Sequence, residues 1–309
     1  MEQHKLWRNL YRSHRYLEHK DNTYIYQRIG DILNIFMILN EKGQLAAHKL
    51  DDKGAYLIQK FTDAHEELVL RKGWPPTEEM KKHLHFPEAS YPMQPLGWNN
   101  ELKENSKNNN YLFKFGSRSY LQDMLDFGKM RISPASMYDD PSLNSAIRDE
   151  ELKLTVEYYP SDVMISYYDP RRKESVGVHP VSNLIKTVEA STNYYVYCVS
   201  TDYKARFFKD FSADSCLIIK DADRFVKTLA KAFYEKISKE WNGYAGLVKY
   251  IDPLFPVEDI DIFFSKDFKY LYQSEFRFVW FPPKAEKNLD SVFVNLGNIN
   301  DYCELNFPK

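Results

Sequence analysis

The spacing of apolar residues changes near residue 95, and this change constrains the fold more than any other feature of the sequence. Before that point apolar residues recur every three or four positions, as they do on one face of a helix. Beyond residue 110 the chain has short runs rich in β-branched and aromatic residues, such as "YLFKF" (111–115) and "NYYVYCVS" (193–200). Because strands outnumber helices and many connections are short, the sequence predicts an α+β protein with a largely antiparallel sheet. The helical positions are Ile25, Ile29, Ile32, Phe36 and Leu39, followed by Ile58, Phe61, His65 and Leu68.

The stretch "PLGWNNELKENSKNNN" (95–110) separates the two regions. It is rich in Asn and charged residues and poor in branched apolar residues, which is typical of a linker or long loop. We therefore predict a helical N-terminal region (1–95), a linker (96–110) and an α+β domain (111–309). Thr77 follows two prolines and is expected to cap a short helix.

In the α+β domain the pattern predicts helices at 118–127 and 221–239. Strands 152–159 and 162–168 are expected to pair as a hairpin. Further strands are expected at "KMRIS", "CLIIK", "AGLVKYI" and "SVFVNL".

Composition excludes several classes of protein. The net charge of −2 does not favour a general nucleic-acid or membrane-surface binder. The three cysteines form no Cys-x-x-Cys pair, so we expect neither a disulfide framework nor a zinc site. No apolar run approaches the ~20 residues that span a bilayer. The N-terminus is polar and does not resemble a secretory signal, so we expect a cytoplasmic protein without a membrane partner.

Histidine placement narrows the chemistry. After residue 90 the only histidine is His179, which precedes a proline, so a Ser-His-Asp or Cys-His site confined to this region would need it. His83 and His85 are two positions apart, which places them on different sides of a helix, and surface positions are the simpler interpretation. The sequence has no Gly-x-Gly-x-x-Gly or P-loop. Carboxylate, amide, arginine and serine chemistry remains.

One cluster of such residues begins at "FGSR". Gly116 follows an aromatic strand and permits close approach of a ligand to the backbone. The helix start at Ser117 and Arg118 offers N–H groups and a charge that suit a phosphate. The alternative is an ordinary strand–turn–helix in which Ser117 is the N-cap.

A second group of polar residues lies in "YDDPSLNSAIRDEE". Four carboxylates there could hold Mg²⁺ for phosphodiester chemistry. The alternative is a solvated helix start that carries Asn144 and Arg148 four positions apart. The carboxylates are Asp139, Asp140, Asp149 and Glu150.

The stretch "YLYQSEFRFVW" (270–280) alternates in character. Phe276, Phe278 and Trp280 fall on one face of a strand, and Gln273, Glu275 and Arg277 fall on the other. The polar face either lines a site or meets solvent, where a Glu–Arg pair contributes little.

Taken in order, these motifs resemble those of ADP-ribosyltransferases. The "FGS" of residues 115–117 corresponds to the family's first-strand element, and "GKMRISPAS" to its second. "QSE" (273–275) corresponds to the strand that carries the catalytic glutamate. The stretches "YDDP", "YCVS", "VKY" and "KDFKYLYQSEFRFVW" also resemble a group of bacterial proteins near phage-defence ADP-ribosyltransferase toxins.

The resemblance implies a split, largely antiparallel sheet with flanking helices that binds NAD as co-substrate in a cleft. It implies Glu275 as the catalytic acid, Gln273 as the residue that orients the acceptor, and no metal. RNA or another nucleic acid is favoured over protein as acceptor, and an antitoxin or chaperone is a possible partner. We expect Gly116, Ser133 or Ser136, and Glu275 to line one cleft. The residues assigned to NAD are Lys114, Gly116, Ser117, Arg118, Arg131, Ser133, Ser136 and Tyr138.

The chain departs from the family at two positions. Phe115 stands where the family has histidine, and Ile132 lies near its tyrosine. A variant site using Lys114, Arg118 or Arg131 is one interpretation. A non-catalytic binding module on the same fold and a Mg²⁺-dependent nuclease are the alternatives. Basic and aromatic residues at 204–211 and 169–174 are candidates for an acceptor surface.

Overall fold

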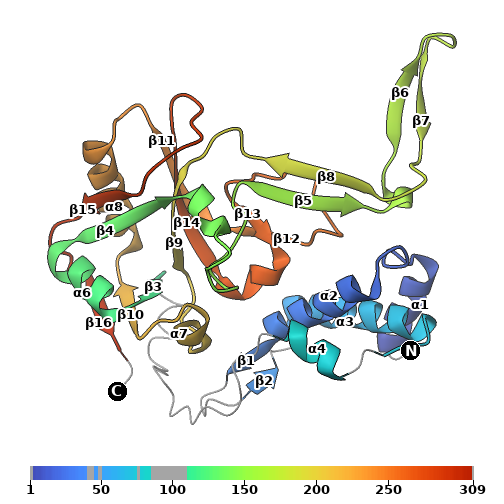
Figure 1. Cartoon of the computed structure of the whole chain (residues 1–309), viewed down its shortest axis with the longest axis horizontal. Coiled ribbons are helices and arrows are strands. Elements are labelled where there is room, and N and C mark those ends of the chain that lie inside the picture. Colours follow the sequence, from blue (N-terminus) through green and yellow to red (C-terminus); the bar gives the residue numbers. More distant parts are fainter. Residues whose placement is uncertain (1–2, 40–44, 48–50, 75–76, 85–109, 308–309) are drawn as a thin grey trace.

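A computed structural model describes residues 3–39, 45–47, 51–74, 77–84 and 110–307 (Figure 1). Nearly all of the predicted linker, and His85, lie outside the described residues, so the boundary at 96–110 stays a prediction. The described part is a mixed α+β structure with a largely antiparallel sheet. None of its helices combines the length and apolar composition needed to cross a bilayer.

Helices predominate in the described N-terminal region, as the apolar periodicity predicts. Asp21 and Asp51 start two of them, because their carboxylates accept hydrogen bonds from the N–H groups of Tyr24 (2.7 Å) and Gly54 (2.8 Å). The prediction for Leu39 is wrong: it was expected to be helical, but it lies beyond the end of the helix, in a short strand. The elements are α1 (Gln3–Ser13), α2 (Asn22–Phe36), β1 (Met37–Leu39), β2 (Leu45–Ala47), α3 (Asp52–Leu70) and α4 (Thr77–His83).

An eight-stranded sheet forms the centre of the rest of the chain. Six strands follow one another in the order β11-β14-β9-β3-β10-β16, and β4 joins β15 to β9; every pairing in this sheet is antiparallel. The strands are β3 (Leu112–Gly116), β4 (Lys129–Pro134), β9 (Tyr195–Ser200), β10 (Ser215–Ile219), β11 (Asn242–Leu247), β14 (Glu275–Phe281), β15 (Val292–Asn295) and β16 (Cys303–Asn306).

The sheet forks at β9. On one side β9 pairs with β14 along its whole length, from Glu275↔Ser200 to Trp280↔Tyr195. On the other side its C-terminal end pairs with β3 at Ser200, and its N-terminal end pairs with β4 at Tyr195 and Val196. The registers leave residues 197–199 between the two branches, and this is where the sheet is split.

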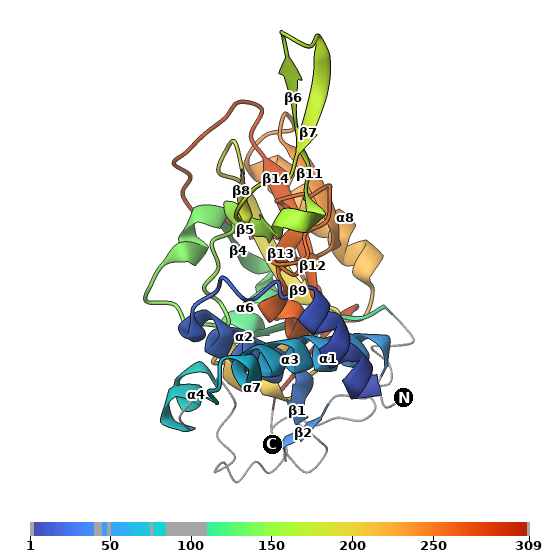
Figure 2. The ribbon, with the colours of Figure 1, turned by 90° about the vertical axis from the view of Figure 1, so that its right-hand side faces the viewer.

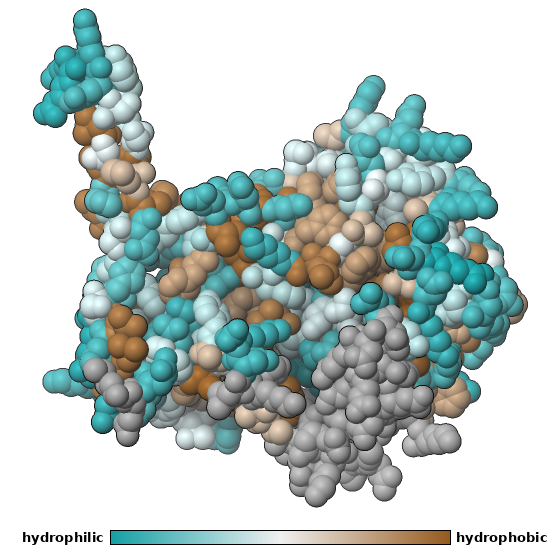
Figure 3. All heavy atoms as spheres, turned by 180° about the vertical axis from the view of Figure 1, so that it is seen from behind, coloured by the Kyte–Doolittle hydropathy of each residue, from teal (hydrophilic) through white to brown (hydrophobic). Residues whose placement is uncertain are grey.

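A hairpin, which we call the arm (residues 164–179), projects from the body (Figures 1 and 2). Viewed from behind, it has apolar residues along its shaft and polar residues at its tip (Figure 3). It consists of β6 (Ile165–Asp169) and β7 (Glu174–Val178), which pair with each other.

The predicted pairing of 152–159 with 162–168 is therefore wrong. β5 (Lys153–Tyr158) pairs instead with β8 (Leu184–Glu189). Asp169 explains the preference for a local hairpin, because its carboxylate accepts a hydrogen bond from Arg171 N (2.8 Å) and closes a tight turn. In contrast, Pro160 opens the 3₁₀ turn η2 (Pro160–Asp162) between β5 and β6.

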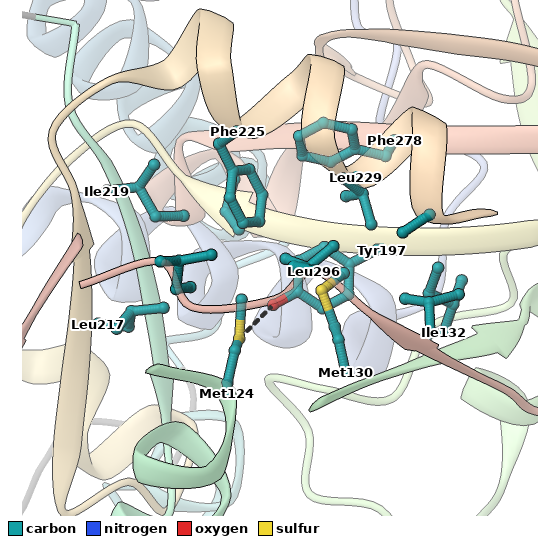
Figure 4. Close-up of a cluster of buried hydrophobic side chains, with 14 of the residues drawn as sticks. Met124, Met130, Ile132, Tyr197, Leu217, Ile219, Phe225, Leu229, Phe278 and Leu296 are labelled. Atoms are coloured by element: carbon teal, nitrogen blue, oxygen red, sulfur yellow. Dashed lines mark hydrogen bonds between the residues drawn. The ribbon is translucent and has the colours of Figure 1, made fainter. Parts of the chain in front are cut away.

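The apolar face of β14 packs against α8 (Ala222–Lys236), as the alternation predicts. Phe278 lies among Phe225 and Leu229 (Figure 4), and the ring of Phe233 stacks on Trp280 at 4.4 Å. Burying each such side chain contributes about 1.5–3 kcal/mol. Helix α6 (Arg118–Phe127) also packs on this core, where Met124 Sδ accepts a hydrogen bond from the Tyr197 hydroxyl (3.7 Å).

The N-terminal helices share their core with the last third of the chain. Ile32 and Ile35 of α2 pack on Phe268 of the 3₁₀ helix η3 (Phe268–Gln273). Arg28 makes a buried bidentate ion pair with Asp252, at 3.0 and 2.7 Å. The helical region is therefore anchored by packing and by charge.

Arg28→Met should lower the free energy of unfolding by about 3–5 kcal/mol, because it leaves the Asp252 carboxylate buried with only the Tyr56 hydroxyl (2.7 Å) as a side-chain partner. Lys81→Met, which breaks an exposed ion pair with Glu78 in α4, is the control and should change it by less than about 0.5 kcal/mol. Urea unfolding measures both. Equal losses would show that the Arg28 pair does not anchor the helices.

Candidate functional site

A cavity of about 580 Å³ lies at the fork of the sheet. Its walls come from β3, β4, β9, the start of β14 and the segment 138–151, so it brings together residues far apart in sequence. Gly116, Ser133 and Glu275 line it together, as expected. The predicted site residues that line the cavity are Lys114, Gly116, Arg131, Ser133, Tyr138, Gln273 and Glu275.

Three predicted NAD-binding residues lie outside the cavity wall. Ser117 is exposed, and its side chain makes no capping hydrogen bond. The guanidinium carbon of Arg118 lies 4.2 Å from the centre of the Phe307 ring. The backbone N–H of Arg118 donates a hydrogen bond to the Asp214 carboxylate (2.6 Å). A carboxylate thus already occupies the helix start where a phosphate was expected. Ser136 accepts a hydrogen bond from Asn193 Nδ2 (2.8 Å), which ties η1 (Ala135–Asp139) to the start of β9.

Glu275 is the first residue of β14 and is only 6% exposed. Its N–H donates to the hydroxyl of Tyr250 (2.8 Å). One carboxylate oxygen accepts from Arg277 Nε (2.7 Å), and the other lies 3.2 Å from Lys266 Nζ. The polar face of β14 is therefore buried and not exposed to solvent.

Gln273 does not belong to the strand, contrary to its predicted place on the Glu275 face. It ends η3, and Ser274, with φ of 48°, turns the chain before β14 begins. Its side chain nevertheless reaches the cavity, where Nε2 donates to the carbonyl of Ala146 (2.7 Å). This hydrogen bond ties Gln273 to the segment 138–151, which forms one wall of the cavity.

Arg277 belongs to a cluster of charged residues at the cavity wall, which we call the charge cluster and define as Asp149, Glu151, Lys266, Glu275 and Arg277. Arg277 is fully buried and makes ion pairs with Glu275 and, at 2.7 Å, with Glu151. Lys266 lies 3.4 Å from Asp149 and 3.7 Å from Glu151. Sequence reasoning missed Glu151 and Lys266, although Lys266 begins the "KDFKYLYQSEFRF" stretch that carried the resemblance.

The cluster has three carboxyl groups for two cations. Burial alone would raise the pKa of Glu275, but Arg277 and Lys266 outweigh it and hold that pKa below its usual range. Burial raises the pKa of Glu151 to about 7 despite the same two cations, and the carboxylates of Asp149 and Glu275 add to the shift. The carboxyl of Glu151 therefore takes up a proton as pH falls through about 7, while Glu275 stays ionised.

The cysteine of the cavity wall is not activated as a nucleophile. Burial, reinforced by Glu275, raises the pKa of Cys198 well above its ordinary value, so the thiol stays protonated. Burial lowers the pKa of Lys114, whose Nζ donates to the carbonyl of Cys198 (2.8 Å). His179 lies at the base of the arm, where Nδ1 is 2.8 Å from the carbonyl oxygen of Val163.

The four carboxylates considered for Mg²⁺ are engaged separately. Asp139 lies 3.7 Å from Arg148, and Asp140 accepts from Ser142 N (2.8 Å). In the part of the chain that the structure describes, no group of three or more His, Cys, Asp or Glu residues could hold a metal ion. The alternative interpretation, a helix start that carries Asn144 and Arg148, is also wrong. Residues 141–147 form turns and bends, in which Asn144 Oδ1 accepts from Ala146 N (3.1 Å).

One predicted acceptor surface is not available. Arg206, Phe207 and Phe208 are buried in α7 (Arg206–Asp210), and Arg206 pairs with Asp210 at 2.6 Å. The amphipathic pattern of 204–211 thus marks core packing. The other candidate, 169–174, is the tip of the arm.

Comparison with known proteins identified no relative: no family model matches the chain, and no curated protein or solved structure is significantly similar to it.

The raised pKa of Glu151 predicts how stability depends on pH. Between pH of about 4.5 and 7 the folded protein binds more protons than the unfolded chain, so the free energy of unfolding falls as pH rises, by on the order of 2–3 kcal/mol from this group. Glu275 has a lowered pKa, and its contribution is lost only below this window. Urea unfolding at pH 5 and 7.5 should show a smaller decrease in Glu151→Gln than in wild type.

Asp31 must be separated from this effect, because burial and Asp267 raise its pKa to about 7 as well. Asp31 is unchanged in the Glu151→Gln variant, so the difference between variant and wild type isolates Glu151. Equal pH dependence in the two proteins would contradict the assignment.

Proposed function

We propose that the protein is an NAD-dependent mono-ADP-ribosyltransferase and that the cavity at the fork is its active site. The observation that carries this proposal is Glu275: a carboxylate held ionised by Arg277 and Lys266 on the wall of a cavity enclosed by two branches of the sheet. A fixed negative charge in a largely dry site is what a reaction with a cationic transition state needs. The order of motifs that resembles ADP-ribosyltransferases supports the same activity.

The walls suit NAD in size and chemistry. The volume falls within the ~300–1,000 Å³ that is usual for small-molecule sites. Tyr138 and Tyr197 offer aromatic surface for a flat ring, and Lys114 and Arg131 offer charge for a pyrophosphate. Gly116 has an ordinary backbone, and a Cβ there would meet Leu121 at 3.6 Å, which is normal contact. Protein packing alone does not require glycine, whereas close approach of a ligand would.

The proposed chemistry breaks the bond between C1′ of the nicotinamide ribose and the nicotinamide nitrogen. The bonding electrons leave with nicotinamide, which is neutral once released, and positive charge develops on the ribose. Glu275 stabilises that charge. An acceptor heteroatom then bonds to C1′ and releases its proton. The resemblance implies that Gln273 orients the acceptor, and its place in the cavity wall supports this role.

The resemblance further implies a cytoplasmic toxin of anti-phage defence, with RNA or another nucleic acid as acceptor and an antitoxin or chaperone as partner. We carry these points as part of the proposal. Incubation with labelled NAD and a lysate, followed by separation of RNA, DNA and protein, would identify the acceptor class.

A second candidate is a non-catalytic module that binds NAD. Phe115 stands where the family has histidine, and its ring packs against Phe207 and Phe208 at 5.2 Å. Ile132 is fully buried in the main core. Neither residue can replace the polar side chain of the family, and this observation favours binding without turnover.

Glu275→Gln should lower the rate of nicotinamide release from NAD by ~10²–10³-fold. It should leave the fold intact, because removing one carboxylate balances the two cations of the cluster with Asp149 and Glu151. Glu150→Gln is the matched control, since Glu150 is an exposed acid next to Glu151, lies outside the cavity wall, and should keep wild-type activity. Thermal unfolding verifies that both variants fold.

Two outcomes would contradict parts of this proposal. Wild-type protein that binds NAD in calorimetry but releases no nicotinamide would identify the binding module. Release by Glu275→Gln at the wild-type rate would remove Glu275 from the mechanism.

The two arginines near the ends of α6 allow a second test. Arg131 lines the cavity and Arg118 does not. Arg131→Met should raise the KM for NAD about tenfold or more, the loss expected when a charge-assisted contact worth about 1.5–3 kcal/mol is removed. Arg118→Met should leave KM within about twofold. Steady-state kinetics measure both KM values. A larger rise of KM in Arg118→Met than in Arg131→Met would place the pyrophosphate at the start of α6.

A further inference from the structure

The arm carries an apolar face that nothing in the described structure covers. Cross-strand pairing places Ile165 opposite Val178 and Tyr167 opposite Val176, so all four side chains lie on one face of the hairpin. Ile165, Tyr167 and Val178 are 41%, 51% and 42% exposed. Isolated two-stranded hairpins are marginally stable in water, and they gain stability when such a face is packed.

The opposite face differs. It carries Ser166 opposite Gly177 and Tyr168 opposite Ser175. Met164 lies over Gly177 and covers part of it. The opposite face thus mixes Ser166 and Ser175 with Tyr168 and Met164, which are 62% and 68% exposed. The first face consists of four apolar side chains without a polar one, and we call it the apolar face.

Charge is segregated along the length of the arm. The tip carries Arg171, Arg172 and Lys173, and of these Arg172 lies near Asp169 (3.8 Å) and Glu174 (3.9 Å). The base carries Asp162, whose side chain is 52% exposed although it lies 3.3 Å from His14 Nε2. With Asp169 and Glu174 counted, residues 169–174 have a net charge of +1, and Asp162 places an acid two residues before the arm begins.

We propose that the arm binds the arm of a second copy of this chain, apolar face to apolar face, around a twofold axis. A twofold axis perpendicular to the two arms makes them antiparallel, so each tip lies beside the base of the other arm. The cations of one tip then meet Asp162 of the second copy. The pattern is therefore complementary to itself in both apolar residues and charge. This inference does not depend on the proposed catalytic activity.

A nucleic acid fits this surface less well. Residues 162–174 contain three acids and three bases, so the arm lacks the net positive charge that phosphate binding needs. Ile165, Val176 and Val178 have no matching group on a phosphate backbone. The two apolar faces alone make an interface below the usual size of stable dimers, so we expect a Kd in the micromolar range.

Sedimentation velocity from about 1 to about 100 µM brackets a micromolar Kd. Wild-type protein should shift from monomer to dimer over this range. Tyr167→Lys places a charge on the apolar face and should remain monomeric. Ser175→Lys, on the opposite face of the same arm, is the matched control and should dimerise like wild type. Far-UV circular dichroism verifies that the variants fold.

A charge reversal tests the antiparallel arrangement. Arg171→Glu with Lys173→Glu should weaken the dimer about tenfold or more, and adding Asp162→Lys to that variant should restore it. Wild type that stays monomeric at all concentrations, or Tyr167→Lys that dimerises normally, would overturn the proposal. Monomeric wild type that retards RNA in a gel would overturn it in favour of a nucleic-acid surface.

Discussion

The buried guanidinium of Arg277 is the interaction on which the site depends. Removing a charge from water costs several kcal/mol unless good partners replace the water. Arg277 has those partners: Glu275 in its own strand, Glu151 through two nitrogens, and the carbonyl of Phe263 (3.0 Å). They come from three separate segments. One side chain in the middle of β14 therefore fixes the segment 149–151 and the approach to β13 (Ser265–Asp267) against the sheet.

The fork at β9 creates the space that this cluster borders. On this side of β9, residues 197–199 have no neighbouring strand to pair with their backbone N–H and C=O groups. Burying such groups without hydrogen-bond partners is costly. Lys114 meets part of this need, because its ammonium donates to the carbonyl of Cys198 between the branches. The same lysine lies 4.5 Å from the centre of the Tyr197 ring. The opening is thus stabilised by a side chain that also lines the cavity.

Local sequence patterns predicted many of the strands and helices, but they could not predict which distant residues cover each face of those elements. Alternation separated Phe278 from Arg277 correctly, because side chains alternate along any strand. It could not show that the polar face is dry, since Glu151 and Lys266, which cover it, come from distant segments. Likewise, the pattern at 204–211 could not show that Arg206 is buried, because its partners include the carbonyl of Asn34 (2.6 Å), more than 160 positions away.

Hydrogen bonds from backbone N–H groups to carboxylates explain two further differences from the prediction. The helix start at Ser117 was a reasonable phosphate site, yet Asp214 reaches Arg118 N from the far end of another loop. The predicted hairpin at 152–168 does not form, because β6 pairs with β7 across the tight turn that Asp169 closes. In both cases a carboxylate satisfied nearby backbone N–H groups and decided the outcome.

The position of Arg277 also bears on how Glu275 could act. Two cations beside a carboxylate would weaken its field if both lay between it and a ligand. Arg277, however, is absent from the cavity wall that the described residues form, whereas Glu151, Lys266 and Glu275 are all part of it. The guanidinium therefore keeps Glu275 ionised and oriented from behind, without covering its cavity side. Such preorganisation would require no movement of dipoles during the proposed reaction, which is the condition under which a fixed charge lowers a barrier most.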